Sequence, residues 1–426
     1  MVRELKHTEI GDIPVDWELQ TFEETFSILS NNTLSRENLN NCGGAVKNIH
    51  YGDIITRFSE VLDCKNENIP YLNDISLLTS SAQLLQDGDI IIADTAEDET
   101  VGKTTEVQGL GNGKMVAGLH TIPCRVKKGE FTPGWLGYYM NSHMYHNQIL
   151  PFITGIKVSS ISKSVLAKTI IVVPPIDEQK QIIEVLSEID LLIQKEQKVI
   201  DKIIEIKTGC LSKMFPKEGE NIPELRLPEF TDVWEQCKLL DIVDLTSSKR
   251  IHAQDYVENG IPFYRGKEIS ELREHKQVSE VLYITEEKFE EMNRLYGSPQ
   301  LGDILITAVG TIGNTWVVDS VPFYFKDGNL IWFKNIKCNH NYLDYILSSN
   351  DGQKKIVASA IGSNQKALTM VKLNELEFMF PSECEQEQIT MYFNNLDYFL
   401  TFHQRKCEKY MKLKLGLISM LISTRK

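Results

Sequence analysis

The stretches that come nearest to catalytic motifs each lack a residue that the chemistry requires. Gly102, Lys103 and Thr104 end like a phosphate-binding loop, but Glu97 stands where that loop needs a glycine. The glycine-rich residues 109–114 lack the strand, the helix and the downstream acid of a dinucleotide-binding fold. The 9 histidines have no metal-ligand spacing, and the 8 cysteines are far apart, with no CxxC pair. A binding protein is therefore favoured over an enzyme.

Other polar side chains gather in short loops, where their types suit hydrogen bonding to nucleic acids. Arginine and lysine bind guanine, asparagine and glutamine bind adenine, and serine and threonine mostly contact phosphates. In the second half of the chain these loops are residues 246–250, 263–268, 307–315 and 362–366, all beside strand signals. Their candidate DNA-binding residues are Lys249, Arg250, Arg265, Lys267, Asn314, Asn364, Gln365 and Lys366. The alternative for each is an ordinary solvated loop residue.

The first half of the chain carries a matching set of candidates. They are Arg57, Lys103, Lys157, Ser159 and Lys163, with Thr95 and Thr104 expected beside the phosphates. The carboxylates of residues 97–99 would repel phosphate unless they turn away or accept hydrogen bonds from cytosine amino groups. The formal net charge of −14 also argues against nucleic acid, so DNA binding must use local basic faces or the charge of a partner.

Length and composition indicate a soluble protein with more than one domain. A chain of 426 residues exceeds what one hydrophobic core usually serves. Its hydrophobic content of 42% and charged content of 24% are ordinary for globular proteins. Neither a signal sequence nor a membrane span is evident, so a cytoplasmic location and no membrane partner are expected.

A long internal repeat organises the chain. "PPIDEQKQIIEVLSEID", residues 174–190, returns as "PSECEQEQITMYFNNLD", residues 381–397, and Lys207 returns as Lys414 at the same offset. Upstream, each copy is preceded by a tryptophan-led start and a Gly-Asp turn before a β-branched run. A period this long indicates a duplicated half, with the plan of globule, long helix, globule, long helix.

Each expected long helix begins after proline and shows an apolar seam with a seven-residue repeat. The first places Ile182, Ile189, Glu196, Ile203 and Cys210 at position a, and Val185, Leu192, Val199, Ile206 and Lys213 at position d. The second places Ile389, Leu396, His403, Tyr410 and Leu417 at position a, and Tyr392, Phe399, Lys406, Leu413 and Met420 at position d. Both seams carry polar residues near their middle, which is typical of a coiled coil with a set register.

Duplicated units related by a pseudo-twofold axis would pair these helices antiparallel. If the first helix is centred between Gln197 and Lys198, Glu196 falls opposite Lys406, and Val199 falls opposite His403. We expect a central ion pair between Glu196 and Lys406. The alternative is that each helix packs only on its own globule.

With its two EQ-x-Q-I helices and tryptophan-led globules, nearly the whole chain resembles the specificity (S) subunit of type I restriction-modification systems. The resemblance implies an α+β fold, in which two α/β target recognition domains are joined and spaced by two long helices that form an antiparallel coiled coil. Recognition domains are expected at residues 1–173 and 217–380, and the conserved helices at 174–216 and 381–426.

The resemblance also implies the partners. A non-catalytic S subunit would read a split target on double-stranded DNA, one half per domain, and bind two methyltransferase subunits, which two restriction subunits can join. No cofactor is expected in this chain, because S-adenosylmethionine would belong to the methyltransferase and ATP with Mg²⁺ to the restriction subunit. The competing hypothesis is a coiled-coil scaffold that joins protein partners without touching DNA.

Overall fold

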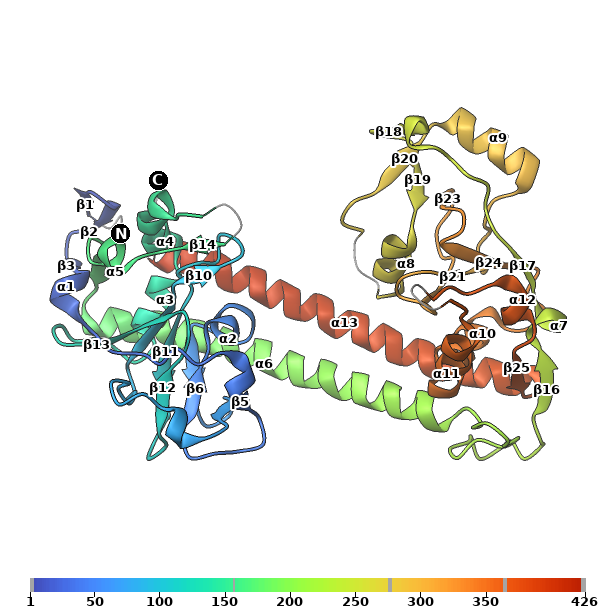
Figure 1. Ribbon diagram of the computed structural model, residues 1–426. Coiled ribbons are helices and arrows are strands. Elements are labelled where there is room, and N and C mark those ends of the chain that lie inside the picture. Colours follow the sequence, from blue (N-terminus) through green and yellow to red (C-terminus); the bar gives the residue numbers. More distant parts are fainter. Residues whose placement is uncertain (1–3, 156–157, 275–277, 363–365, 423–426) are drawn as a thin grey trace. The chain divides into compact units, whose positions relative to one another are not determined.

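The structure is a computed structural model that describes residues 4–155, 158–274, 278–362 and 366–422. It divides into two compact units. The first unit comprises residues 1–195 and 407–426, and the second unit comprises residues 196–406. The two long helices, α6 (Ile176–Lys213) and α13 (Glu383–Ile422), each contribute to both units (Figure 1).

The first unit is built around a five-stranded sheet in the order β4-β13-β9-β11-β7. A four-stranded sheet, β12-β6-β8-β5, and three two-stranded pairs complete it. Its strands are β1 (Leu5–Thr8), β2 (Gly11–Pro14), β3 (Glu18–Thr21), β4 (Phe26–Ile28), β5 (Leu39–Asn40), β6 (Lys47–Ile49), β7 (Val61–Asp63), β8 (Tyr71–Leu72), β9 (Ile90–Ala93), β10 (Thr95–Ala96), β11 (Thr104–Gln108), β12 (Met115–Ala117), β13 (Thr121–Val126), β14 (Ser159–Ser160) and β15 (Ile170–Val173). Its short helices are α1 (Phe22–Thr25), α2 (Tyr51–Thr56), α3 (Trp135–Met140), α4 (His143–Ile149), α5 (Lys163–Leu166) and the 3-10 turns η1 (Arg36–Asn38), η2 (Ile75–Leu77) and η3 (Leu150–Phe152).

The second unit has two four-stranded sheets, β17-β24-β21-β22 and β18-β20-β19-β23. Its strands are β16 (Glu235–Lys238), β17 (Asp244–Thr246), β18 (Tyr256–Val257), β19 (Ile261–Tyr264), β20 (Leu282–Ile284), β21 (Ile304–Thr307), β22 (Thr315–Val317), β23 (Tyr324–Phe325), β24 (Leu330–Lys334) and β25 (Glu377–Phe380). Its helices are α7 (Leu239–Ile242), η4 (Ala253–Asp255), α8 (Gly266–Arg273), α9 (Glu286–Tyr296), α10 (His340–Ser348), α11 (Asn350–Ser359) and α12 (Met370–Asn374).

The two units repeat one internal plan. The strand after each Gly-Asp turn, β9 or β21, lies inside its sheet with antiparallel neighbours on both sides. The order β4-β13-β9-β11 in the first unit is therefore matched by β17-β24-β21-β22 in the second. A two-stranded pair joins the start of each globule to the strand before its long helix, β3 with β15 and β16 with β25. The duplication expected from the sequence is present at the level of strand order.

The repeated Glu-Gln pair fastens each long helix to the tryptophan that opens its globule. In the first unit the Glu178 carboxylate accepts a hydrogen bond from the Trp17 indole at 2.9 Å. In the second unit Glu385 accepts one from the Trp234 indole at 3.2 Å. The next residue, Gln179 or Gln386, donates its amide to the carbonyl of the proline before the helix at 2.9 Å. These side-chain bonds tie the first turn of each long helix to its globule and to the segment that precedes it.

The long helices run antiparallel within each unit. In the first unit Ile182 and Leu186 share a core with Ile418 and Ile422. In the second unit the residues 210–215 share a core with residues 389–393. These contacts confirm the antiparallel pair, and each helix also packs into the core of a globule, so the alternative of two separate helices is not supported.

The central ion pair expected from the sequence is confirmed within the second unit. The Glu196 carboxylate lies 2.6 Å from the Lys406 ammonium and 2.7 Å from Nδ1 of His403. His403 thus contacts Glu196, while Val199, expected opposite His403, is 39% exposed.

Most of the expected d positions are wrong. Ile206, Phe399 and Leu413, placed at position d, are exposed, as Val199 is, and the residue after each d position is instead covered, as at Leu186, Ile200, Phe393, Cys407 and Lys414. Among the other residues of the expected seam, Ile182 is buried, while Ile189, Leu192, Ile203, Leu396 and Tyr410 are partly covered. The covered residues are thus the a positions and the residues that follow the d positions, in steps of four and then three. The expected seam has steps of three and then four, with the same mean period, so the period alone does not distinguish the two, and packing on the globules selects the observed one.

Candidate nucleic-acid interface

A surface cavity of about 560 Å³ in the second unit is lined by two of the candidate residues, Arg265 and Lys267. Arg265 follows strand β19 and caps helix α8, and Lys267 is the second residue of that helix, so both lie at the junction of a strand and a helix. The loop after β21 supplies the facing wall. The full lining is Arg265, Gly266, Lys267, Ser270, Glu271, Glu274, Glu280, Val309, Gly310, Thr311 and Asn329.

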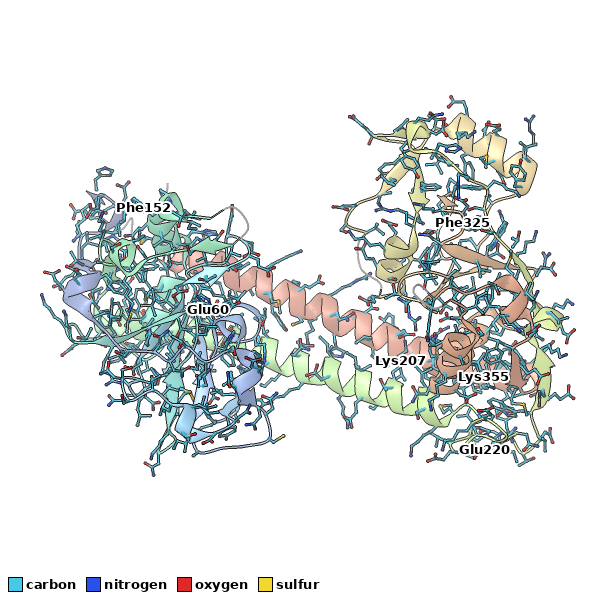
Figure 2. The ribbon with its side chains drawn as sticks, in the orientation of Figure 1. Glu60, Phe152, Lys207, Glu220, Phe325 and Lys355 are labelled. Atoms are coloured by element: carbon cyan, nitrogen blue, oxygen red, sulfur yellow. The ribbon has the colours of Figure 1, made fainter. Side chains whose placement is uncertain are left out.

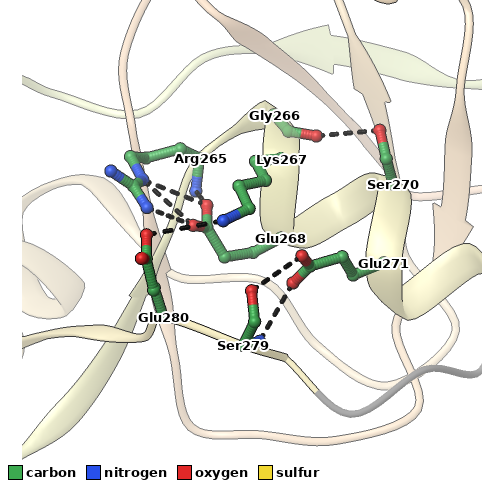
Figure 3. A network of polar contacts seen from close by, with 8 residues as sticks. All are labelled: Arg265, Gly266, Lys267, Glu268, Ser270, Glu271, Ser279 and Glu280. Atoms are coloured by element: carbon green, nitrogen blue, oxygen red, sulfur yellow. Dashed lines mark hydrogen bonds and ion pairs between the residues drawn. The ribbon is translucent and has the colours of Figure 1, made fainter. Parts of the chain in front are cut away.

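Arg265 is held in one orientation by a buried carboxylate (Figure 3). Glu268 is fully buried, and it accepts from Nη2 of Arg265 at 2.5 Å and from Nε at 3.0 Å. The Glu268 carboxylate also accepts from the Arg265 backbone N–H at 2.6 Å, which satisfies an amide at the start of α8. These hydrogen bonds to Glu268 raise the pKa of Arg265 above its usual range. The guanidinium is therefore a fixed and permanently charged donor.

The remaining charges in this cavity are partly matched to each other. Lys267 lies 3.4 Å from Glu280, in a pair whose side chains are 52% and 76% exposed. Glu271 accepts from the backbone N–H and hydroxyl of Ser279 at 3.2 and 2.9 Å (Figure 3). The cavity thus presents acceptors beside its donors.

The other candidates of the second unit lie on several loops. Lys249 is exposed, with its ammonium 5.5 Å from the Tyr296 ring centre, and Arg250 pairs with Asp327 at 3.0 Å. The Asn314 amide donates to the Ser270 hydroxyl at 3.0 Å, which connects it to helix α8. Lys366 is exposed. Asn364 and Gln365 lie outside the described residues.

In the first unit two candidates are already engaged by the protein. Arg57 binds the buried carboxylate of Asp53 at 3.0 Å and the Asn68 carbonyl at 2.8 Å. The Lys103 ammonium donates to the Ile55 carbonyl at 2.8 Å, and burial lowers its pKa. Both side chains are held in place in the folded unit, which limits how far they can extend to DNA.

Thr104 does not fit the expected role beside a phosphate. It is fully buried at the start of β11, and its hydroxyl donates to the Gly102 carbonyl at 3.0 Å. The reason is its place in a central sheet, whose residues are covered on both faces. We therefore leave Thr104 out of the interface proposed below.

The remaining first-unit candidates lie near the end of β9. Thr95, on β10, donates its hydroxyl to Asp94 at 2.8 Å, and β10 pairs with β14, where Ser159 lies opposite Ala96. Lys163 is exposed at the first position of α5. Lys157 lies outside the described residues.

The structure adds two residues that the sequence analysis missed. Asn329 and His120 each stand just before the strand that pairs with β21 or β9, because Leu330 is paired with Thr307 and Thr121 with Ala93. Asn329 lines the cavity, and His120 adopts a φ of +54° with Nδ1 3.3 Å from both Asp94 and the Thr95 hydroxyl. A positive φ in a non-glycine residue is strained and is enriched at functional sites. Only this backbone conformation, and not the sequence, draws attention to His120.

A second repeated constellation joins each globule to both long helices. In the first unit the Lys414 ammonium lies 2.6 Å from Asp190, contacts Glu60, and stands 5.3 Å from the Tyr138 ring centre. In the second unit Lys207 contacts Asp397 and lies 5.7 Å from the Tyr345 ring centre. Figure 2 labels Glu60 and Lys207 in their units. In each set the tyrosine hydroxyl donates to the aspartate, at 2.5 and 2.9 Å.

Within the described part of the chain, no group of three or more histidine, cysteine, aspartate or glutamate side chains is arranged to hold a metal ion. Of the helices that are described, none combines the length and the apolar character needed to cross a membrane.

Comparisons with known proteins agree with this architecture. The family model of the type I restriction modification DNA specificity domain matches residues 14–205 and 231–409, so the chain belongs to this family, whose members confer DNA sequence specificity and are not catalytic. Among relatives, the chain is 25% identical to a Methanocaldococcus jannaschii protein described as the type I restriction enzyme MjaX specificity subunit, over 98% of this chain and 95% of that protein.

The fold is also found among solved structures. One similar chain comes from a type I R-M system studied for complex assembly and conformational transition, with a TM-score of 0.55, 15% identity and coverage of 96% of this chain and 98% of that one. Another is the S subunit from M. genitalium, with a TM-score of 0.50, 14% identity and full coverage of both chains. Together with the family match, these structures confirm the expected fold class.

Proposed function

We propose that this chain selects a bipartite DNA target for a type I restriction-modification complex, with each unit reading one half. The observation that carries the proposal is the repeated plan of the two units, in which polar loops follow the same central strand, β9 or β21. Two copies of one reader on a single chain suit a duplex target made of two half-sites. Divergent loops on a shared framework allow each half-site to have its own sequence.

The proposed readers are the exposed or partly exposed loop residues near these strands. Among the described residues they are Arg57, Thr95, Lys103, Ser159 and Lys163 in the first unit, and Lys249, Arg250, Arg265, Lys267, Asn314 and Lys366 in the second. The proposal also keeps Lys157, Asn364 and Gln365, which lie outside the described residues. Because the chain carries a net charge of −14, much of the attraction to phosphates must come from its partners.

The long helices provide a surface for two identical partner subunits. Exposed apolar residues recur at the repeat offset, as Leu191 with Tyr398 and Ile204 with Met411. Exposed apolar side chains at repeated positions mark an interaction site when they form a patch, and Tyr398 lies in ring contact with Phe399 and Phe402. We propose that two methyltransferase subunits bind these faces and supply S-adenosylmethionine, and that restriction subunits, where present, supply ATP and Mg²⁺ chemistry in the cytoplasm.

Sequencing methylated adenines in a genome with and without this chain tests the proposal. We expect methylation at one split motif that disappears when the chain is deleted and returns when it is restored. Methylation that persists unchanged, or that ignores base sequence, would contradict the proposal and favour the scaffold hypothesis. A gel shift of the purified complex on random duplexes gives the same distinction in vitro.

A further inference from the structure

The lining of the Arg265 cavity combines hydrogen-bond donors with acceptors, as a site that reads bases requires. Two cations, Arg265 and Lys267, line it together with three carboxylates, Glu271, Glu274 and Glu280. Behind them the buried Glu268 neutralises Arg265. The cavity therefore carries both donors and acceptors, and a base edge likewise presents both acceptors and donors.

The guanidinium of Arg265 keeps free donors for an outside ligand. Glu268 occupies Nε and one side of Nη2, and among the described residues no acceptor contacts Nη1. An arginine has five N–H donors in a rigid planar fork. The edge that faces away from Glu268 in Figure 3 therefore offers Nη1 and Nη2 side by side. Two parallel donors of this spacing match the O6 and N7 acceptors of guanine in the major groove.

The carboxylates of the cavity complement the other base of such a pair. Cytosine shows an amino group, a donor, beside the guanine acceptors in the major groove, and Glu or Asp can accept from it. Glu280 is 76% exposed and is held only by the 3.4 Å contact with Lys267 among the described residues, so it can turn to a new donor. The cavity thus holds donors that suit guanine and an acceptor that suits cytosine.

We propose that Arg265 is the specificity-determining residue for a guanine in one half of the target, and that Glu268 is the positioning residue that fixes its fork. This inference rests on the proposed function, because it assumes that the second unit contacts DNA. It goes further by naming the base and the residue that sets the orientation of the reader.

The test uses the full chain assembled with its methyltransferase subunits and a library of duplexes randomised at every position of the target. Methylated molecules are sequenced, and the preference for each base is measured position by position. The variants are Arg265→Lys, which keeps the charge without the fork, and Glu268→Gln, which nearly preserves shape but loses the bidentate acceptor. Arg294→Lys, at an exposed arginine of α9 outside the cavity, is the matched control.

Both variants should lower the preference for guanine at a single position by roughly ten- to a hundredfold. The other half-site should keep its preferences, and the melting temperature of the assembled complex should be close to that of the wild type. A merely structural role of Glu268 would lower stability or activity on all sequences alike, which would overturn the inference. An effect at a position where guanine is not preferred, or no change at any position, would overturn it as well.

Failure of the proposed function gives a different result. If the wild-type complex shows no base preference at all, the proposed function is wrong and this inference is wrong with it. If the wild type selects a split motif but Arg265→Lys leaves every preference unchanged, only the assignment of Arg265 is wrong. A lysine at position 265 could still donate one hydrogen bond to guanine, so Arg265→Ala is tested in the same assay, because it removes the donors entirely. A guanine preference that persists in Arg265→Ala would contradict the assignment.

Discussion

The Glu196 carboxylate joins the two long helices by contacting Lys406 at 2.6 Å and His403 at 2.7 Å. Glu196 is only 7% exposed, so these polar contacts are largely shielded from solvent. A polar group at such a position selects one register, because a shifted pairing would leave the carboxylate buried without a partner.

Replacing Glu196 by glutamine should therefore destabilise the chain by about 1 to 2 kcal/mol at pH 7, since hydrogen bonds to a charged group are lost. The bonds from His403 and then Lys406 lower the pKa of Glu196. A lowered folded-state pKa means that the stabilisation is present above the unfolded value of 4.5 and is lost as the pH falls through the folded-state pKa. Denaturant unfolding of both proteins at pH 7 and below pH 4 measures the difference, which should shrink at the lower pH.

The matched control is Glu205→Gln on the same helix. Glu205 pairs with Lys202 at 2.8 Å, but its side chain is 70% exposed, so the change should stay within about 0.5 kcal/mol. An equal loss for Glu196→Gln and Glu205→Gln would show that the central position has no special role.

Lys414→Met should cost about 3 kcal/mol, because it leaves Asp190 and Glu60 near each other without their counter-charge. The Lys414 side chain is 9% exposed, compared with 26% for Lys207 in the equivalent set of the second unit. Lys207→Met should therefore cost less, about 1 to 2 kcal/mol. Thermal or denaturant unfolding of the two variants checks the order, and a larger loss for Lys207→Met would contradict it.

Arg226→Met should unfold the second unit more readily, by about 3 kcal/mol. Arg226 binds Glu385 through two hydrogen bonds, at 2.7 and 2.8 Å, and Glu385 is 2% exposed. Without Arg226 the carboxylate would remain buried, with only the Trp234 indole donating to it among the described residues. Lys217→Met is the control, because the Lys217 side chain is 58% exposed in its pair with Glu224. Fluorescence of the tryptophans during denaturation would follow both variants, and similar midpoints would contradict the prediction.

Lys249→Ala and Lys366→Ala should weaken DNA binding by the assembled complex to a similar extent on all sequences. Both lysines are exposed on loops and suit phosphate contacts, so each change should also lower the slope of log affinity against log salt by about one. Binding titrations at several salt concentrations on two duplexes that differ in one base measure both effects. A loss confined to one of these duplexes would instead make the lysine a base reader.

Tyr398→Ser and Leu191→Ser should each weaken one of the two methyltransferase sites, by about 2 kcal/mol. The two residues occupy the same place in the repeat and are 67% and 51% exposed. Mass measurement of complexes at limiting concentration should show one bound subunit with either variant and none with both. Met391→Ser is the control, since Met391 is exposed but its repeat counterpart is the charged Glu184. Loss of both subunits from a single variant would contradict separate sites.

The sequence predicted the larger architecture because the repeat records it directly. Residues that meet in space, such as Glu196 and Lys406, follow from the repeat centre and an antiparallel pairing, without knowledge of the globules. The d positions could not be predicted in the same way. Phe399 and Phe393 are both apolar, and only the globule core of the second unit determines which one is covered.

The candidate DNA-binding residues were predicted from residue type alone, and the structure changes the role that several of them can have. Arg265 stands in a cavity, but its orientation depends on Glu268, whose negative charge alone would argue against DNA. Thr104 is buried at the start of β11, although the preceding Gly102 and Lys103 resemble an exposed loop in the sequence. Asn329 joins the cavity through strand pairing between distant segments, which a single sequence does not record.

The lysine in each tyrosine-aspartate-lysine set is encoded in the opposite half of the gene from its tyrosine and aspartate. A chain that stopped after the first helix would keep Tyr138 and Asp190 but lose Lys414, while its own Lys207 would lack Asp397. Two such fragments could rebuild both lysine sets, since Lys207 and Lys414 hold the same repeat position, but not the central ion pair, because Glu196 and Val199 stand at the positions of His403 and Lys406. A truncated allele should thus yield a homodimer, which analytical ultracentrifugation would detect as twice the mass of the fragment. Such a homodimer has two identical recognition domains, so its DNA target should be palindromic.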